Sequence, residues 1–271
     1  MRLPIYQVDA FAGRVFGGNP AAVVPLERWL PDATLQAIAA ENNLSETAFL
    51  VREGEAWRLR WLTPTVEVDL CGHATLAAGF VLLRELGAPG DEVRFLTRSG
   101  GLTVRQAEGL LWLELPSLPP QGPAERPEVE AALGAKPLRL LALREVHHGR
   151  YLLAEYAREE EILALQPDIR ALGALRTNVI VSAPGREVDF VSRFFAPASG
   201  VDEDPVTGSA HASLTPFWAA RLGRGSLRAR QLSRRGGELR CELRGERVFL
   251  GGEASLYLRG EILVPGEAYA E

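Results

Sequence analysis

The 271-residue sequence predicts an α+β fold of two pseudo-symmetric lobes, each a curved, mainly antiparallel β-roll around one central helix. Three observations lead to this prediction. Short apolar or alternating runs at strand spacing fill most of the chain. Two similar segments, 69–86 and 204–222, continue as long apolar helices, which is typical of helices buried on all sides. A proline-rich stretch divides the chain nearly in half.

The proline-rich stretch sets the expected domain organisation. Residues 115–130 contain five of the 18 prolines and little apolar periodicity. Such a segment is extended and semi-rigid, as expected of a connector. We therefore expect an N-terminal lobe over 1–116, a connector over 117–126 and a C-terminal lobe over 127–271.

Strands account for most of the predicted elements, and glycine and proline separate them. In the first half we expect strands at 21–26, 46–51, 56–63, 92–99, 102–106 and 110–116. In the second half we expect them at 138–146, 150–156, 177–183, 188–197, 227–233 and 247–264. Short helices are expected at 31–42, 126–134 and 167–175, two of them opening with Pro-Asp.

The two central helices indicate an internal repeat. Asp69 aligns with Asp204 at an offset of 135, whereas the tetrads at 73–76 and 211–214 align at 138, so the register stays open. A helix N-terminus presents unpaired N–H groups and favours anions. If the lobes face each other, both N-termini open into one cleft, for which a small carboxylate is the natural ligand.

Composition argues against several classes of function. The net charge of −5 and the absence of a basic stripe argue against nucleic-acid binding. The sequence has no apolar run of the ~20 residues needed to cross a membrane, and the N-terminus does not resemble a signal peptide. Two cysteines, Cys71 and Cys241, make no disulfide framework, so we expect a cytoplasmic protein.

The sequence also gives no sign of a cofactor. Lys136, the one lysine, follows the connector and is a poor candidate for a pyridoxal phosphate Schiff base. The four histidines lack metal-ligand spacing, and we assign no function to His147 and His148. We read His211 as a structural residue of its helix. We therefore expect neither a metal nor an organic cofactor.

Four segments together resemble the PhzF-like family, the phenazine-biosynthesis isomerase family. They are GGNPAAVV (17–24), NNLSETAFL (42–50), DLCGHATLAAGFVL (69–82) and EDPVTGSAHASL (203–214), in the family's order and at about its spacing. The family is related in fold to diaminopimelate epimerase and proline racemase. The resemblance implies a cofactor-independent isomerase with two β-roll lobes that forms a homodimer. It does not identify the substrate or a phenazine pathway.

The resemblance also implies roles for individual residues. Glu46 matches the acid/base that removes a proton from one carbon of the substrate and delivers it to another. Such a shuttle needs a carboxyl group in a dry pocket. His73 and Asp204 match polar catalytic partners. The remaining matches imply substrate contacts, made by Asn19, Gly72, Gly208 and Ser209.

Three alternatives remain open. The first is an amino-acid epimerase or racemase that uses Cys71, although such enzymes pair two opposed thiols and the second helix offers only Val206 or Ser209. The second is a non-catalytic protein that binds small carboxylates, and the third is a metal hydrolase. Asp204 itself also has an ordinary interpretation, as the N-cap of a helix with Pro205 at its first position.

Overall fold

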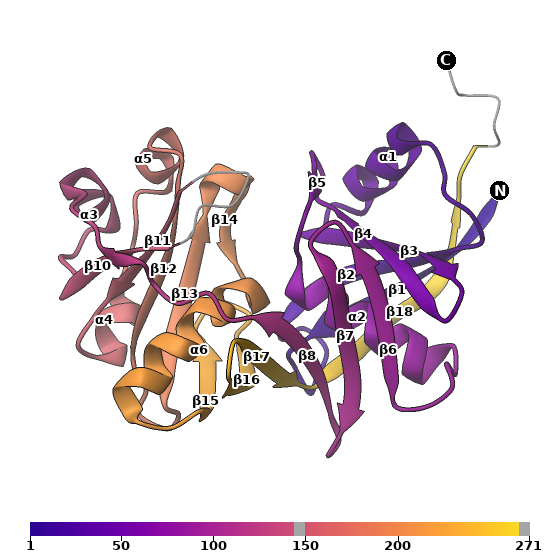
Figure 1. Cartoon of the computed structure of the whole chain (residues 1–271). Helices are drawn as coiled ribbons and strands as arrows, with labels where there is room; N and C mark the ends of the chain where they lie inside the picture. The colour runs from indigo at the N-terminus through magenta and orange to yellow at the C-terminus, as the bar shows by residue number, and fades with distance from the viewer. Residues whose placement is uncertain (144–149, 266–271) are drawn as a thin grey trace. The chain divides into compact units, whose positions relative to one another are not determined.

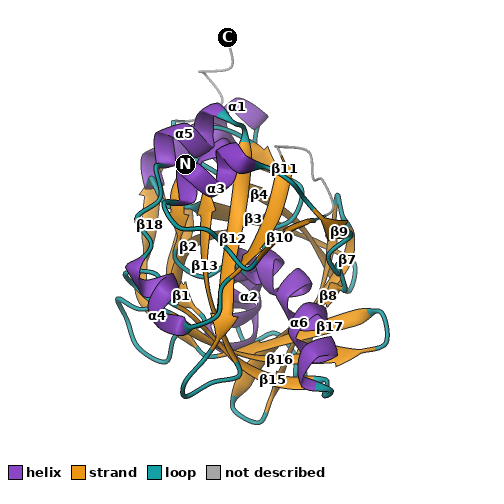
Figure 2. Ribbon diagram, turned by 90° about the vertical axis from the view of Figure 1, so that its left-hand side faces the viewer, coloured by secondary structure: helices purple, strands orange, loops and turns teal. Residues whose placement is uncertain are grey.

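A computed structural model describes residues 1–143 and 150–265 of the chain, and strands dominate it (Figure 2). The chain forms two compact units, which we describe separately. Unit 1 comprises Met1–Glu114 together with 251–265, and unit 2 comprises Leu115–Leu250 (Figure 1). The expected strand at 138–146 and the histidine pair at 147–148 fall partly or wholly outside the described residues.

Unit 1 is a mainly antiparallel sheet. Its strands are β1(Arg2–Ala10), β2(Asn19–Leu26), β3(Glu46–Glu53), β4(Ala56–Leu62), β5(Glu67–Val68), β6(Glu92–Thr97), β7(Gly100–Ala107), β8(Leu110–Pro116) and β18(Ala254–Leu263). Two neighbouring pairs are parallel, β2 with β3 and β4 with β6. Each parallel pair has a helix in its connection, as a crossover requires: α1(Asp32–Asn42) in the first and α2(Gly72–Phe80) in the second.

The helix α2 lies in the interior of unit 1 (Figure 1). All nine of its residues are buried, and it packs against β1, β2, β3 and β7. It continues as a π-helical turn, η1(Val81–Glu85). A Cβ atom built on Gly79 would lie 2.4 Å from Cγ1 of Val104 on β7. The absence of a side chain at Gly79 therefore lets the helix approach this strand closely.

Unit 2 has the same kind of sheet. Its strands are β9(Gly122–Pro123), β10(Arg139–Ala142), β11(Arg150–Glu155), β12(Thr177–Pro184), β13(Phe190–Ala196), β14(Val201–Asp204), β15(Ser226–Gln231), β16(Gly237–Arg244) and β17(Arg247–Gly252). The parallel pairs here are β11 with β12 and β13 with β15. Its helices are α3(Pro127–Leu133), α4(Glu159–Ala164), α5(Ile169–Ala174), α6(Gly208–Leu222) and the 3-10 turn η2(Pro197–Ser199).

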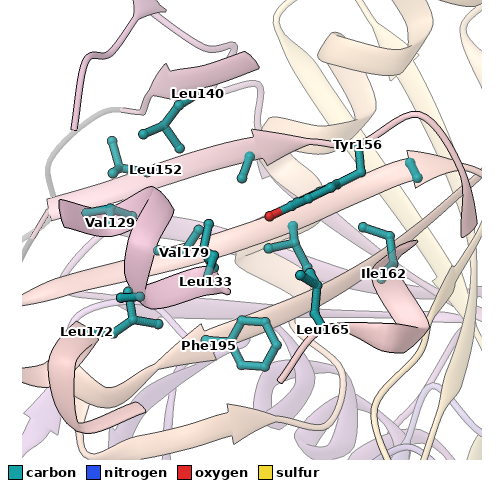
Figure 3. Close-up of a cluster of buried hydrophobic side chains, with 14 of the residues drawn as sticks. Val129, Leu133, Leu140, Leu152, Tyr156, Ile162, Leu165, Leu172, Val179 and Phe195 are labelled. Carbon is teal, nitrogen blue, oxygen red and sulfur yellow. The ribbon is translucent and has the colours of Figure 1, made fainter. Parts of the chain in front are cut away.

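A hydrophobic core lies between the sheet of unit 2 and its three short helices. The side chains from α3, α4 and α5 meet those of β10 to β13 (Figure 3). Val129, Leu133, Ile162 and Leu172 are completely buried there. The long helix α6 is buried over most of its length, with His211, Leu214 and Trp218 among its buried residues. The sequence did not predict the helix α4. It has only six residues and buries a single apolar side chain, Ile162, so it shows no helical repeat of apolar residues.

The order of pairings supports the internal repeat. In unit 1 the sequence β2, β3, β4, β6, β7 pairs as parallel, antiparallel, parallel, antiparallel. In unit 2 the sequence β11, β12, β13, β15, β16 pairs in the same order. The helices α2 and α6 begin at Gly72 and Gly208, an offset of 208 − 72 = 136. This offset differs from both offsets suggested by short sequence matches, and it makes Thr207 the counterpart of Cys71.

The division of the chain differs from the expected one at its C-terminal end. We expected all residues from 127 onward in the second lobe, but β18 pairs antiparallel with β1 from Arg2↔Leu263 to Ala10↔Ala254. These ladder hydrogen bonds join the last strand to unit 1.

In the described part of the chain, no helix has the length and apolar character needed to cross a membrane.

Candidate active site

Glu46 opens strand β3 at the end of the loop that follows α1. Its backbone is opposite Ala21 in the parallel ladder with β2, so β2 and β3 hold its position. The next residue is also fixed, because the amide Nδ2 of Asn42 donates to Oγ1 of Thr47 at 3.1 Å. The Glu46 side chain is 15% exposed. A carboxyl group from the loop–strand junction is thus largely removed from water yet still accessible.

His73, the second residue of α2, lies beside this carboxyl group. Its Nε2 is 3.1 Å from Oε2 of Glu46, an ion-pair distance without the alignment of a hydrogen bond. Its Nδ1 is 3.1 Å from Nδ2 of Asn19 and 3.5 Å from Sγ of Cys71. The structure therefore brings together three residues expected in the site, Asn19, Glu46 and His73, from β2, β3 and α2.

The charges of this group affect its protonation. Burial disfavours the charged ring of His73, but its contacts with Cys71 and with the negative Glu46 carboxylate outweigh burial, so the pKa of His73 lies well above its ordinary 6.5. Burial, followed by the negative charge of Glu46, raises the pKa of the Cys71 thiol to about 11. Cys71 is therefore almost entirely protonated at neutral pH, which makes it a poor base.

The same three side chains have a spacing that a metal ion can use. One ligand atom from each of Glu46, Cys71 and His73 lies within 4.8 Å of the others. Sequence spacing alone gave no sign of this cluster, because Glu46 is far from the other two in the chain. The chemistry of such a set suits Zn²⁺ only if the thiol ionises, and burial and Glu46 oppose that step.

The N-terminus of α2 adds backbone donors to the site. The helix begins at Gly72, and its N-cap residue Cys71 has extended backbone and makes no side-chain capping bond. The first turn has no acidic residue. Amide groups at a helix start therefore lie next to His73, an arrangement that favours an anion.

In unit 2, Asp204 is not the N-cap of α6 as its ordinary interpretation predicts. It ends strand β14, the helix begins at Gly208, and Thr207 is the N-cap. Pro205 consequently lies before the helix rather than at its first position. Oγ1 of Thr207 instead donates to Oδ2 of Asp204. Three residues separate the end of the strand from the first residue of the helix, so Asp204 precedes the N-cap position instead of occupying it.

Gln231 holds this loop in place and was missed by sequence reasoning. Its Nε2 donates to the carbonyl oxygen of Asp204 at 2.7 Å and lies 3.2 Å from Oγ1 of Thr207. Its Oε1 accepts from the backbone N–H of Thr207 at 2.9 Å. The side chain is completely buried on β15. The only sequence signal was a glutamine at an inward position of a strand whose charged residues are both arginines.

The other expected residues of unit 2 lie on α6. Gly208 is its first residue and is buried, and Ser209 is half-buried beside it. Nδ1 of His211 lies 2.8 Å from the carbonyl oxygen of Thr207, and burial lowers the pKa of His211 to about 4. His211 is therefore a neutral core residue at physiological pH. The second cysteine, Cys241, is buried on β16, and burial raises its pKa to about 12.

The comparisons with known proteins agree on one family. The model of the family described as phenazine biosynthesis-like protein, PhzC-PhzF, matches residues 8–260. A protein of Pseudomonas aeruginosa named as an uncharacterized isomerase is 53% identical over 97% of this chain and 99% of its own length.

Solved structures agree with the sequence comparison. The crystal structure of a PhzF-family protein from Enterococcus faecalis is 47% identical, with a TM-score of 0.90 over 97% of this chain and 100% of that one. A probable proline racemase from Agrobacterium radiobacter shares the fold, with a TM-score of 0.65 at 12% identity over 99% of this chain and 94% of the other. The predicted α+β fold of two β-roll lobes is thereby confirmed. The chain belongs to the PhzF family of phenazine biosynthesis-like proteins, which includes proteins named as isomerases.

Proposed function

We propose that this protein is a cofactor-independent isomerase that moves a proton within a small carboxylated substrate. The observation that carries the proposal is the largely buried Glu46 carboxyl group, 3.1 Å from His73 at the start of a buried helix. Proton transfer at carbon needs a base with little competing water and a neighbour that can carry charge. The contact between Glu46 and His73 meets both requirements.

In the proposed reaction, the carboxylate of Glu46 takes a proton from one carbon of the substrate. The electron pair of that C–H bond forms a new double bond to the adjacent carbon, and the π pair of the double bond already there shifts to a second carbon, with the negative charge shared with the conjugated carboxylate. The protonated Glu46 then returns the proton to a second carbon, so the substrate is isomerised and the enzyme is regenerated. One carboxyl group on one face suits this shift, whereas inversion of a stereocentre normally needs a second base on the opposite face.

His73 and the amide of Gly72 have supporting roles in the proposal. A charged His73 stabilises the carboxylate form of Glu46 between turnovers, and the α2 N-terminus binds the negative charge that develops on the substrate. Backbone donors of this type contribute about 3 kcal/mol each to a transition state. In unit 2, we propose that Asp204, Ser209 and the amide of Gly208 contact polar groups of a substrate.

The assembly and location of the protein are also proposals. The family resemblance supports a homodimer, and the scarcity of cysteine supports a cytoplasmic location. Sedimentation of the purified protein measures the first, and a mass near 29.5 kDa rather than twice that value would contradict it.

Hydrogen exchange in D₂O tests the proposed chemistry. The wild type is incubated with cyclic unsaturated carboxylic acids and amino acids, and the C–H signals are followed by NMR. We expect deuterium to enter one substrate, and the rate to fall by at least ~10²-fold in Glu46→Gln. Glu53→Gln is the matched control, because Glu53 lies at the exposed end of the same strand. Exchange that persists in Glu46→Gln at the wild-type rate would refute the assignment of the base.

A second variant separates the isomerase from a thiol-based epimerase. The counterpart of Cys71 in the repeat is Thr207, so the chain does not place a second thiol there. We expect Cys71→Ser to retain most of the exchange activity. Abolished activity in Cys71→Ser would instead favour the epimerase, and binding of carboxylates without any exchange would favour a binding protein.

A further inference from the structure

The loop before each central helix is tied to the hairpin that follows that helix. In unit 1, Oγ of Ser99 donates to the carbonyl oxygen of Asp69 at 2.7 Å. In unit 2, Oγ of Ser233 donates to the carbonyl oxygen of Pro205 at 2.7 Å. Asp69 and Pro205 are counterparts, because 205 − 69 = 136 is also the offset between the two helix starts. The serine bond is therefore common to both halves of the repeat and belongs to the fold.

Unit 2 departs from the repeat at two positions that contact each other. Asp204, the last residue of β14, stands where unit 1 has Val68, the last residue of β5, since 204 − 68 is again 136. Gln231 ends β15, whose counterpart β6 ends at Thr97. The hydroxyl of Thr97 bonds within its own turn, where it donates to the carbonyl oxygen of Gly100 at 2.6 Å. The glutamine thus accompanies the buried acid in unit 2.

The contacts of Gln231 fix the orientation of its carboxamide. A backbone N–H can only donate, and a backbone carbonyl oxygen can only accept. The side chain faces one of each, the N–H of Thr207 at 2.9 Å and the carbonyl oxygen of Asp204 at 2.7 Å. Oε1 must therefore face Thr207 and Nε2 must face Asp204. The reversed carboxamide would place two donors together at one end and two acceptors at the other.

This one planar group bridges the whole loop. Asp204 ends the strand and Thr207 is the N-cap of α6, so the carboxamide sets the spacing between strand end and helix start. Nε2 also lies 3.2 Å from Oγ1 of Thr207, and that hydroxyl donates to Oδ2 of Asp204. Gln231 therefore restrains the backbone of the loop and, through Thr207, the carboxylate of Asp204.

We propose that Gln231 is a positioning residue, which holds the carboxylate of Asp204 and the first turn of α6 in the arrangement that contacts substrate. This role rests on the substrate contacts proposed for unit 2. Without the bridge, the loop keeps the serine bond that both units share, so the unit still folds while the carboxylate of Asp204 is less restrained. Loss of Gln231 weakens substrate binding and leaves proton transfer at Glu46, a residue of unit 1, intact.

Amide hydrogen exchange at Thr207, followed by NMR without substrate, tests the bridge. We expect it to be about tenfold faster in Gln231→Met, which has a side chain of similar length but no amide. Gln231→Thr, which introduces the residue type of the counterpart strand, serves if that variant does not fold. Ser233→Ala is the matched control, because it removes the shared serine bond and leaves the carboxamide in place. Equal protection of Thr207 in the wild type and in Gln231→Met would overturn the proposal, as would a failure of both Gln231 variants to fold.

Deuterium uptake by the substrate separates a positioning role from a purely structural one. In Gln231→Met we expect KM for this exchange to rise about tenfold and the maximal rate to stay within about threefold of the wild type. A protein that is only destabilised would instead lose maximal rate at unchanged KM, because fewer molecules are folded. An unchanged KM in a variant that has lost the protection of Thr207 would overturn the positioning role.

The bridge and the proposed function can fail separately. The amide exchange of Thr207 is read without substrate, so it can refute the bridge while Glu46→Gln still abolishes deuterium uptake by the substrate. Uptake at the wild-type rate in Glu46→Gln would overturn the proposed function, and with it the part of this proposal that concerns substrate, whatever the protection of Thr207.

Discussion

Acidification should destabilise this protein through His211, the buried histidine of α6. The ring is completely buried, lies 5.8 Å from the Phe190 ring in a tilted arrangement, and donates from Nδ1 to the carbonyl oxygen of Thr207. Its Nε2 makes no hydrogen bond within the described residues. Because a charged imidazole in this position would be poorly solvated, burial lowers the pKa of His211 to about 4.

The sign and size of the effect follow from this pKa. In the unfolded chain His211 has its ordinary pKa of 6.5, whereas in the folded protein the pKa of the ring is about 4. Stability is therefore lost as the pH falls through this window and changes no further below it. The complete shift of about 2.5 units corresponds to about 3 kcal/mol, of which about 2 kcal/mol is lost by pH 5.

Urea unfolding at pH 7.5 and pH 5.0 measures the effect, with His211→Asn as the matched variant. The Nδ2 of asparagine can replace Nδ1 as the donor to Thr207, and asparagine does not titrate. The folded-state pKa of His73 is raised, so its contribution is present below 6.5 and lost at higher pH, which is the opposite dependence. Subtracting the pH dependence of the variant from that of the wild type cancels this term.

The wild type should lose about 2 kcal/mol more than His211→Asn between the two pH values. Equal losses in both proteins would refute the reasoning. They would mean that the ring is charged in the folded state or that unfolding at pH 5 bypasses the core of unit 2. The stability at pH 7.5 alone is not diagnostic, because asparagine also leaves part of the ring volume empty.

Three further predictions concern packing, capping and metal dependence. Gly79→Ala should lower the free energy of unfolding by about 1–3 kcal/mol, because the added Cβ would meet Val104 at 2.4 Å, and Val104→Ala should restore part of the loss in thermal unfolding. Asp168→Ala should cost about 1 kcal/mol in urea unfolding, because Asp168 caps α5 by accepting from the N–H of Ala171 at 2.9 Å, and an unchanged midpoint would contradict this role. Dialysis against a chelator should leave deuterium exchange unchanged. Activity that is lost on dialysis and restored by Zn²⁺ would instead identify Glu46, Cys71 and His73 as a metal site.

Local sequence was sufficient for most of the elements and for the type of fold, although it did not predict β1, β16 or α4. Apolar runs at strand spacing and two helices without a polar face have few stable arrangements other than sheets wrapped around helices, because every apolar side must be covered. The short motifs around Glu46, His73 and Asp204 were also visible, since each lies at the start or end of an element where loops hold functional groups.

Tertiary structure alone decided which atoms meet. The contact of Asn19, Glu46 and His73 joins β2, β3 and α2, and no periodicity fixes a distance between side chains so far apart in sequence. The same holds for Gln231, whose partners lie more than twenty residues away. The final strand joins unit 1 through ladder bonds to β1, and backbone hydrogen bonds of this kind carry no signature in the side chains. Sequence thus determines what each segment can form, whereas long-range pairing determines which segments come together and which side chains make contact.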